Sequence, residues 1–158
     1  RARRRVAPVT IGSDSPRLPH DAREPLQFVF SDGAYRLGVL TDVGASTPHI
    51  VTMLNGCDAL VLECNHDVDM LASSRYPKSL KARIAGSHGH LSNDAAAGIL
   101  SSLDRTRLKR VVAAHLSQQN NAPELARSAL AAVLGAALDD VVVASQDEGF
   151  GWLALGSA

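Results

Sequence analysis

Residues 58–67 read DALVLECNHD, an apolar run that changes abruptly to polar side chains. The apolar part is too short for a free-standing helix and is typical of a buried strand. Glu63 and His66 stand just past this strand, and the ends of strands are where sheets often present functional sites. A simpler interpretation stays open for His66 and Asp67, which can begin the next helix without any chemical role.

Strand and helix patterns alternate on both sides of this strand. Residues 26–30 and 35–40 flank a glycine-containing turn and predict a hairpin, and a short helix follows over 48–55. Further helices are expected over residues 67–74, 77–86, 92–103 and 121–137, and further strands over 109–115, 140–145 and 151–156. Asn121 and Glu124 form a capping-box pattern at the start of the last helix. The alternation predicts an α/β domain whose helices cover a sheet.

Composition indicates a globular domain. The chain has 158 residues, of which 46% are hydrophobic and 20% charged, and 16 basic residues balance 16 acidic ones. No overall field therefore marks a nucleic-acid or membrane binder, although residues 1–5 are locally basic. Cys57 and Cys64 follow no signal peptide, so we expect reduced thiols in a cytoplasmic protein. The apolar runs fall far short of the ~20 residues that span a bilayer, so no membrane partner is expected.

Three candidate metal ligands occupy similar settings. His20 in LPHDA precedes an expected strand, Asp42 in GVLTDVG follows one, and His115 in VVAAHLS ends one. Imidazole and carboxylate groups bind zinc or manganese, and strand ends hold them rigidly enough to define coordination geometry. Taken singly, each has a simpler interpretation, as a structural histidine or as a turn-forming aspartate.

The order of these motifs resembles the C-terminal half of the metallo-β-lactamase superfamily, in its YycJ/WalJ-like branch of bacterial hydrolases. That branch is related in layout to the tRNA 3′-processing endonucleases. The resemblance runs from about residue 18 to about residue 135. It rests on PHDAREP (19–25), GVLTDVG (38–44), DALVLECNHD (58–67), GHLSN (89–93) and AHLSQQNN (114–121).

The resemblance implies an αββα sandwich with two divalent metal ions, zinc or manganese, between its sheets. By analogy His20 would bind the first metal, Asp42 would bridge both and act in catalysis, and His115 would complete the second. A hydroxide activated by the two ions would be the nucleophile. The chain would supply only the C-terminal portion of the sandwich.

GHLSN is similar to the GHST turn of the tRNA-processing relatives. His90 would therefore lie beside the metals and would bind the scissile phosphate or protonate the leaving group. Ser92 and Asn93 would support an anion at the following helix. The alternative is that Ser92 or Asn93 only caps that helix and that His90 packs, whereas His88 is expected to be an exposed turn residue.

Two further residues gain roles only from the resemblance. Glu63 would orient a metal-ligating histidine by accepting its hydrogen bond. Asn120 would lie in a loop at the rim of the site.

The superfamily draws its remaining ligands from an upstream HxHxDH run, and this sequence contains no such run. Residues 1–158 are thus expected to form one incomplete domain, with residues 1–17 as an irregular entering segment and weak or partial metal binding. The chain begins without Met, and we expect it to be part of a longer protein.

The predicted function is a metal-dependent hydrolase of nucleic-acid phosphodiesters, nuclease-like and active only with the upstream half. Nucleic acid is then the expected partner, and a homodimer is possible because an incomplete sandwich exposes apolar sheet surface. Two alternatives stay open. The first is a hydrolase of a small ester, thioester or lactone, and the second is an inactive truncated chain or binding module.

Overall fold

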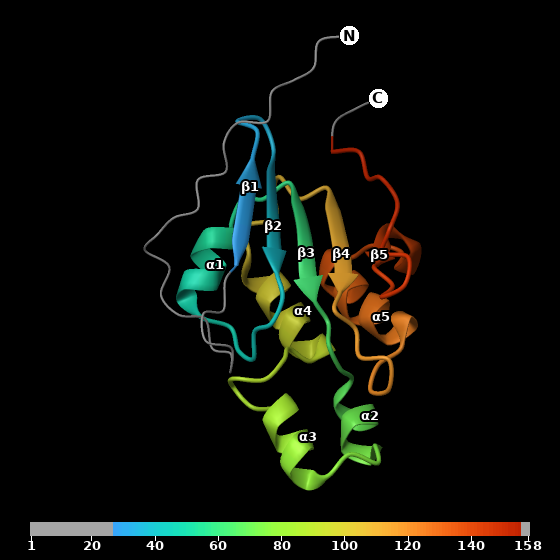
Figure 1. The fold of residues 1–158 in the computed structure, drawn as a ribbon. Coiled ribbons are helices and arrows are strands. Elements are labelled where there is room, and N and C mark those ends of the chain that lie inside the picture. Colours follow the sequence, from blue (N-terminus) through green and yellow to red (C-terminus); the bar gives the residue numbers. More distant parts are fainter. Residues whose placement is uncertain (1–26, 156–158) are drawn as a thin grey trace.

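The computed structural model describes residues 27–155, apart from the side chain of Asp139. His20 and the predicted entering segment, residues 1–17, lie outside the described residues. The elements alternate along the chain (Figure 1). In order they are β1 (Phe28–Ser31), β2 (Arg36–Leu40), α1 (Pro48–Leu54), β3 (Ala59–Glu63), α2 (Val68–Ser73), α3 (Lys78–Ile84), α4 (Asn93–Ser102), β4 (Arg110–Ala114), α5 (Pro123–Leu134), the 3-10 turn η1 (Leu138–Asp140) and β5 (Val141–Val143).

The strands form one sheet in the order β1–β2–β3–β4–β5. β1 pairs antiparallel with β2, and the other neighbouring strands are parallel. Side chains alternate between the two faces of a strand, and Leu40, Leu60 and Leu62 are almost fully buried in the core with residues of α1, α4 and α5. These helices therefore cover one face of the sheet, as the sequence pattern predicts (Figure 1).

The carboxyl ends of β2, β3 and β4 meet at one edge of the sheet because these strands are parallel. Asp42 stands two residues beyond β2, Glu63 is the last residue of β3, and His115 directly follows β4. The register pairs Glu63 with Ala114. The fold thus brings three of the predicted site residues to neighbouring positions, and α2 and α3 lie beyond the same edge (Figure 1).

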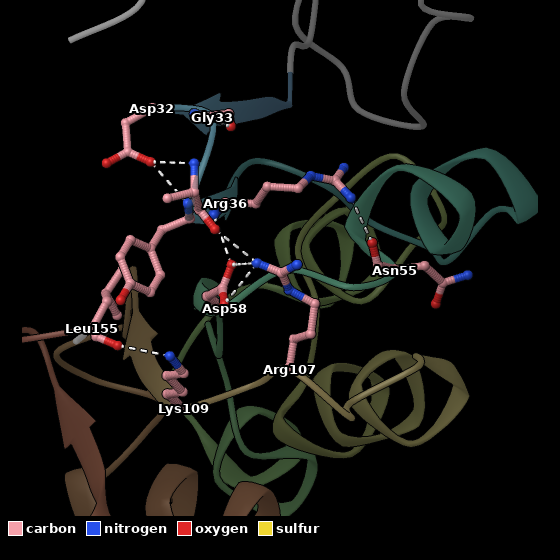
Figure 2. A network of polar contacts seen from close by, with 11 residues as sticks. Asp32, Gly33, Arg36, Asn55, Asp58, Arg107, Lys109 and Leu155 are labelled. Atoms are coloured by element: carbon pink, nitrogen blue, oxygen red, sulfur yellow. Dashed lines mark hydrogen bonds and ion pairs between the residues drawn. The ribbon is translucent and has the colours of Figure 1, made fainter. Parts of the chain in front are cut away.

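An ion pair with a buried carboxylate joins segments at the opposite end of the sheet. Asp58 directly precedes β3 and is only 2% exposed. Its carboxylate accepts hydrogen bonds from the backbone N–H of Arg36 at 2.8 Å and from the guanidinium of Arg107 at 3.0 Å (Figure 2). Burial alone would raise the pKa of Asp58, but these two partners hold it below its usual range. The pair joins β2, β3 and the loop before β4.

Two expectations from the sequence are wrong. Residues 151–155 form no strand. Four of them line an apolar cavity with Val61 and Val112, on the face of the sheet opposite the Leu62 side chain, and the Leu155 carbonyl accepts a hydrogen bond from Lys109. This segment therefore lies over a face of the sheet and does not pair with the sheet edge as a further strand.

The second error concerns the capping box at α5. Ala122 is the residue that precedes the helix, and no side chain caps it. The Asn121 carboxamide is engaged elsewhere, since it bonds to Asn93 and to the carbonyl of Cys64. In the described part of the chain, every helix is too short or too polar to be a candidate membrane span.

Candidate active site

Three potential metal donors converge at the carboxyl edge of the sheet. Asp42, His90 and His115 each offer one donor atom, and these atoms all lie within 4.8 Å of one another. Asp42 and His115 come from the strand ends, and His90 comes from the turn between α3 and α4. A carboxylate with two imidazoles suits zinc or manganese, and three protein donors are typical of a catalytic zinc site.

Glu63 lies at the centre of this group and is fully buried. Its Oε1 atom lies 2.7 Å from Nδ1 of His90 and 3.1 Å from Nδ1 of His115. Its Oε2 atom accepts the backbone N–H of Val43 at 2.9 Å. An ionised carboxylate can only accept, so both Nδ1 atoms must carry hydrogen, and each neutral ring then keeps its lone pair on Nε2. The contacts expected of a residue that orients histidines are present at Glu63.

The pKa values of the site reflect these contacts. Burial alone would raise the pKa of Glu63, but hydrogen bonds with His115 and His90 and from the Val43 N–H hold it below its usual range. The hydrogen bond to Glu63 raises the pKa of His115, against the effect of burial. The centre of the site is therefore a carboxylate kept ionised by its neighbours.

Asp42 and His115 share an unusual backbone conformation. Their φ angles are +58° and +59°, in the left-handed region that glycine favours. They are the two non-glycine residues with positive φ among residues 27–155. Strained backbone of this kind is concentrated at functional sites, where the surrounding structure holds it in place.

Close glycine contacts position the His90 turn. A Cβ atom added at Gly89 would lie 2.2 Å from the carbonyl oxygens of Arg83 and Ile84, and one added at Gly44 would lie 2.5 Å from Gly89 N. The backbone N–H of His90 also donates to the Ile84 carbonyl at 2.9 Å. The Asp42 loop, the end of α3 and the His90 turn therefore meet backbone to backbone.

A buried pair of amides joins the start of α4 to the loop before α5. Asn93 and Asn121 exchange reciprocal hydrogen bonds of 2.9 Å, and Asn121 also donates to the Cys64 carbonyl at 2.7 Å. Asn93 is 4% exposed, and its N–H donates to the His66 carbonyl. The sequence suggested an anion-binding role for Asn93, and in the structure its side chain is hydrogen-bonded within this amide pair.

Ser92 and Asn120 make hydrogen bonds within their own segments of the chain. Ser92 caps α4, because its hydroxyl accepts the Ala95 N–H at 3.1 Å. Asn120 is 1% exposed and bonds to Ser117 within its own loop. His88 is exposed, as predicted. The roles of Ser92, Asn93 and Asn120 toward substrate stay predictions, and their observed contacts are structural.

A cavity of about 290 Å³ opens beside His90 and His115. Its wall includes Gln118 and Gln119, from the AHLSQQNN loop expected at the rim of the site, and Tyr76, which sequence reasoning did not single out. Tyr76 stands between α2 and α3, and the two glutamines stand in the loop after β4. The donor group thus borders a polar space large enough for part of a substrate.

Comparison with known proteins fits this arrangement. The chain is 38% identical over 117 residues to exodeoxyribonuclease YycJ of Bacillus anthracis, covering 74% of this chain and 44% of that protein. It is 34% identical over 116 residues to exodeoxyribonuclease WalJ of Streptococcus pneumoniae, covering 73% and 43%. No known family profile matches it. The chain thus spans less than half the length of the curated relatives it matches.

Among solved structures, the chain resembles the metallo-β-lactamase fold protein YhfI from Bacillus subtilis. The TM-score is 0.61 at 18% identity, covering 87% of this chain and 47% of that one. The α/β class expected from the sequence is confirmed, and the chain belongs to the metallo-β-lactamase superfamily. Within it, the matched sequences place the chain in the YycJ/WalJ-like branch.

Proposed function

We propose that this chain forms part of the active site of a metal-dependent nuclease that hydrolyses phosphodiester bonds in DNA. The observation that carries the proposal is the convergence of Asp42, His90 and His115 around the buried carboxylate of Glu63. The names of the relatives, exodeoxyribonucleases, favour DNA as the substrate class.

Asp42 and His115 are the residues that would hold divalent metal, zinc or manganese. Bound metal would supply water activation and neutralise charge on the phosphate. Glu63 fixes His115 through Nδ1, so that Nε2 is the nitrogen left to bind. Three converging donors are too few for two well-held ions. We therefore propose that hydrolysis depends on further ligands, of which His20, outside the described residues, is one candidate.

His90 is proposed to handle the proton of the leaving group. It borders the 290 Å³ cavity, and its Nδ1 atom is held by Glu63 at 2.7 Å. That contact fixes the ring and leaves Nε2 as the atom that gives up or receives a proton. Because His90 also belongs to the donor group, metal content must be measured to separate a ligand from an acid.

The test compares metal binding and hydrolysis in two proteins. Zinc or manganese is titrated into the 158-residue chain, and single-stranded DNA hydrolysis is assayed with the full-length product of the gene. We expect weak metal binding to the chain, which Asp42→Ala or His115→Ala removes and Asp69→Ala, in exposed α2, does not. Unchanged metal binding in Asp42→Ala and His115→Ala, together with no DNA hydrolysis by the full-length product, would overturn the proposal.

A further inference from the structure

A second cavity of about 450 Å³ adjoins the one beside His90 and His115. It lies between the loop that follows β4 and the loop that follows β5, two neighbouring parallel strands. Leu116, Ser117, Gln118 and Gln146 line both cavities. The two cavities therefore share part of their lining and could hold successive parts of one ligand.

Arg127, in the second turn of α5, lines this second cavity. Its Nε atom is buried and has no hydrogen-bond partner among the described residues. A buried donor without a partner costs about 1–3 kcal/mol, so native proteins almost always provide one, from the chain, from water or from a ligand. A guanidinium is the side chain best suited to a phosphate, which it can bind through two parallel N–H groups.

Two serines add neutral donors to the same cavity. The hydroxyl oxygen of Ser117 accepts the Asn120 N–H, and that of Ser145 accepts the Glu148 N–H. Each hydroxyl therefore still has its own hydrogen to donate to an anion. Asp147 also lines the cavity and opposes an anion, so the site would bind phosphate with moderate strength.

We propose that the second cavity binds a phosphate group of the DNA strand, adjacent to the phosphodiester beside His90 and His115, with Arg127 as its principal cation. The identity of the strand rests on the proposed function, whereas the anion site rests on the cavity and on Arg127. Phosphate contacts of this kind position a strand without reading its sequence.

The test uses the 158-residue chain in the presence of a chelator, so that metal does not contribute. Binding of a short fluorescent single-stranded oligodeoxynucleotide is followed by anisotropy over a range of salt concentrations. Arg127→Gln should weaken binding about tenfold, as for loss of one charged hydrogen bond. It should also reduce the salt slope by about 0.7, the value for one phosphate contact in single strands. Asp147→Asn should strengthen binding.

Arg110→Gln is the matched control, because it removes the same charge at the start of β4, away from the carboxyl ends of the strands. A second readout needs no substitution: the NMR signal of Arg127 Nε–H in the unmodified chain should shift on adding the oligonucleotide. Equal binding by Arg127→Gln and the wild type, or an unmoved Nε–H signal, would overturn the proposal. A shift with inorganic phosphate but none with the oligonucleotide would also do so, by showing a site for free anions. DNA hydrolysis by the full-length product is measured separately, so the proposed function can survive any of these results.

Discussion

At the scale of single residues, the site depends on a left-handed backbone conformation that residues other than glycine seldom adopt. Asp42 and His115 both adopt positive φ just beyond the ends of parallel strands, where Val43 and His115 contact Glu63. Asp tolerates this region better than most residues, whereas β-branched residues rarely enter it. The two residues therefore combine a chemical role with a conformational one.

The conformational role of Asp42 can be measured without metal. Asp42→Asn should leave the free energy of unfolding nearly unchanged, because Asn accepts left-handed backbone. Asp42→Val should lower it by about 1–3 kcal/mol, since a branched Cβ is strained there. Chemical denaturation in the presence of a chelator checks both values. Both variants lose the carboxylate, so equal stabilities would show that the strain has no energetic weight.

His90 and His88 offer a matched pair two residues apart. In the full-length product, His90→Ala should reduce turnover on DNA by roughly 10²- to 10⁴-fold, the usual contribution of a positioned acid or base, while metal content is retained. His88→Ala should change neither, because His88 is exposed and its Nδ1 atom pairs with the hydroxyl of the neighbouring Ser87. Loss of metal in His90→Ala would make it a ligand, and near-full turnover would make it a packing residue.

The pH dependence of stability should show the contact between His115 and Glu63. The folded-state pKa of His115 is raised from 6.5, so its contribution is fully present below pH 6.5 and is lost as pH rises through the raised value. Glu63, whose pKa is lowered from 4.5, contributes above pH 4.5 and loses its effect as pH falls through the lowered value. Cys64 affects the pH dependence of stability only above its ordinary pKa of 9.0, because burial raises its pKa to about 12.

The prediction therefore concerns the range between pH 6.5 and pH 9. Metal-free wild-type chain should become less stable across this range, and His115→Gln should not. Denaturation midpoints at several pH values, with chelator present, provide the measurement. A wild-type curve that is flat over this range would show that the charged hydrogen bond is absent in solution.

At the scale of elements, the strands and helices were largely predictable from the sequence, because apolar residues recur with one spacing in strands and another in helices. The hairpin of β1 and β2, the buried strand β3 and the capped helix α4 follow from apolar spacing and turn residues. The strand predicted over residues 151–156 is wrong because an alternating apolar pattern does not show whether a segment pairs with a strand edge or lies over a sheet face.

The loops were less predictable. The Asn93–Asn121 bond joins residues 28 positions apart, and the contact of Gly44 with Gly89 leaves no local pattern. The resemblance placed Asp42, His90 and His115 in one site, but neither it nor the pattern indicated Arg127 or the positive φ angles. Those features arise only when separate loops are packed together.

The Gly89 contact can be tested against a glycine in an open setting. Gly89→Ala forces a Cβ atom against the carbonyls of Arg83 and Ile84 and should destabilise the chain by about 1–3 kcal/mol. It should also weaken metal binding, because Gly89 packs against Gly44 in the Asp42 loop, and that loop must move with it. Gly98→Ala, in α4 with nothing near its Cβ position, should stabilise by about 0.5–1 kcal/mol. Denaturation and metal titration of both variants check this, and a stabilised Gly89→Ala would contradict the packing described.

At the scale of the whole molecule, the two ends of the sheet have different roles. The Asp58–Arg107 ion pair fastens the end where β3 and β4 begin, and the candidate site occupies the end where they finish (Figures 1 and 2). Between them, within the described part of the chain, residues 150–155 lie over the face opposite the helices and leave an apolar cavity of about 460 Å³ there.

Trp152, the one tryptophan of the chain, stands at that cavity with its side chain fully exposed. The indole fluorescence of the chain therefore comes from a single side chain that is already in water. Unfolding should change its emission wavelength very little, and a conventional fluorescence melt would miss the transition. Anything that covers this face should shift the emission to shorter wavelengths and protect it from a soluble quencher. The emission of Trp152 should thus report whether this face of the sheet is covered and should respond little to unfolding.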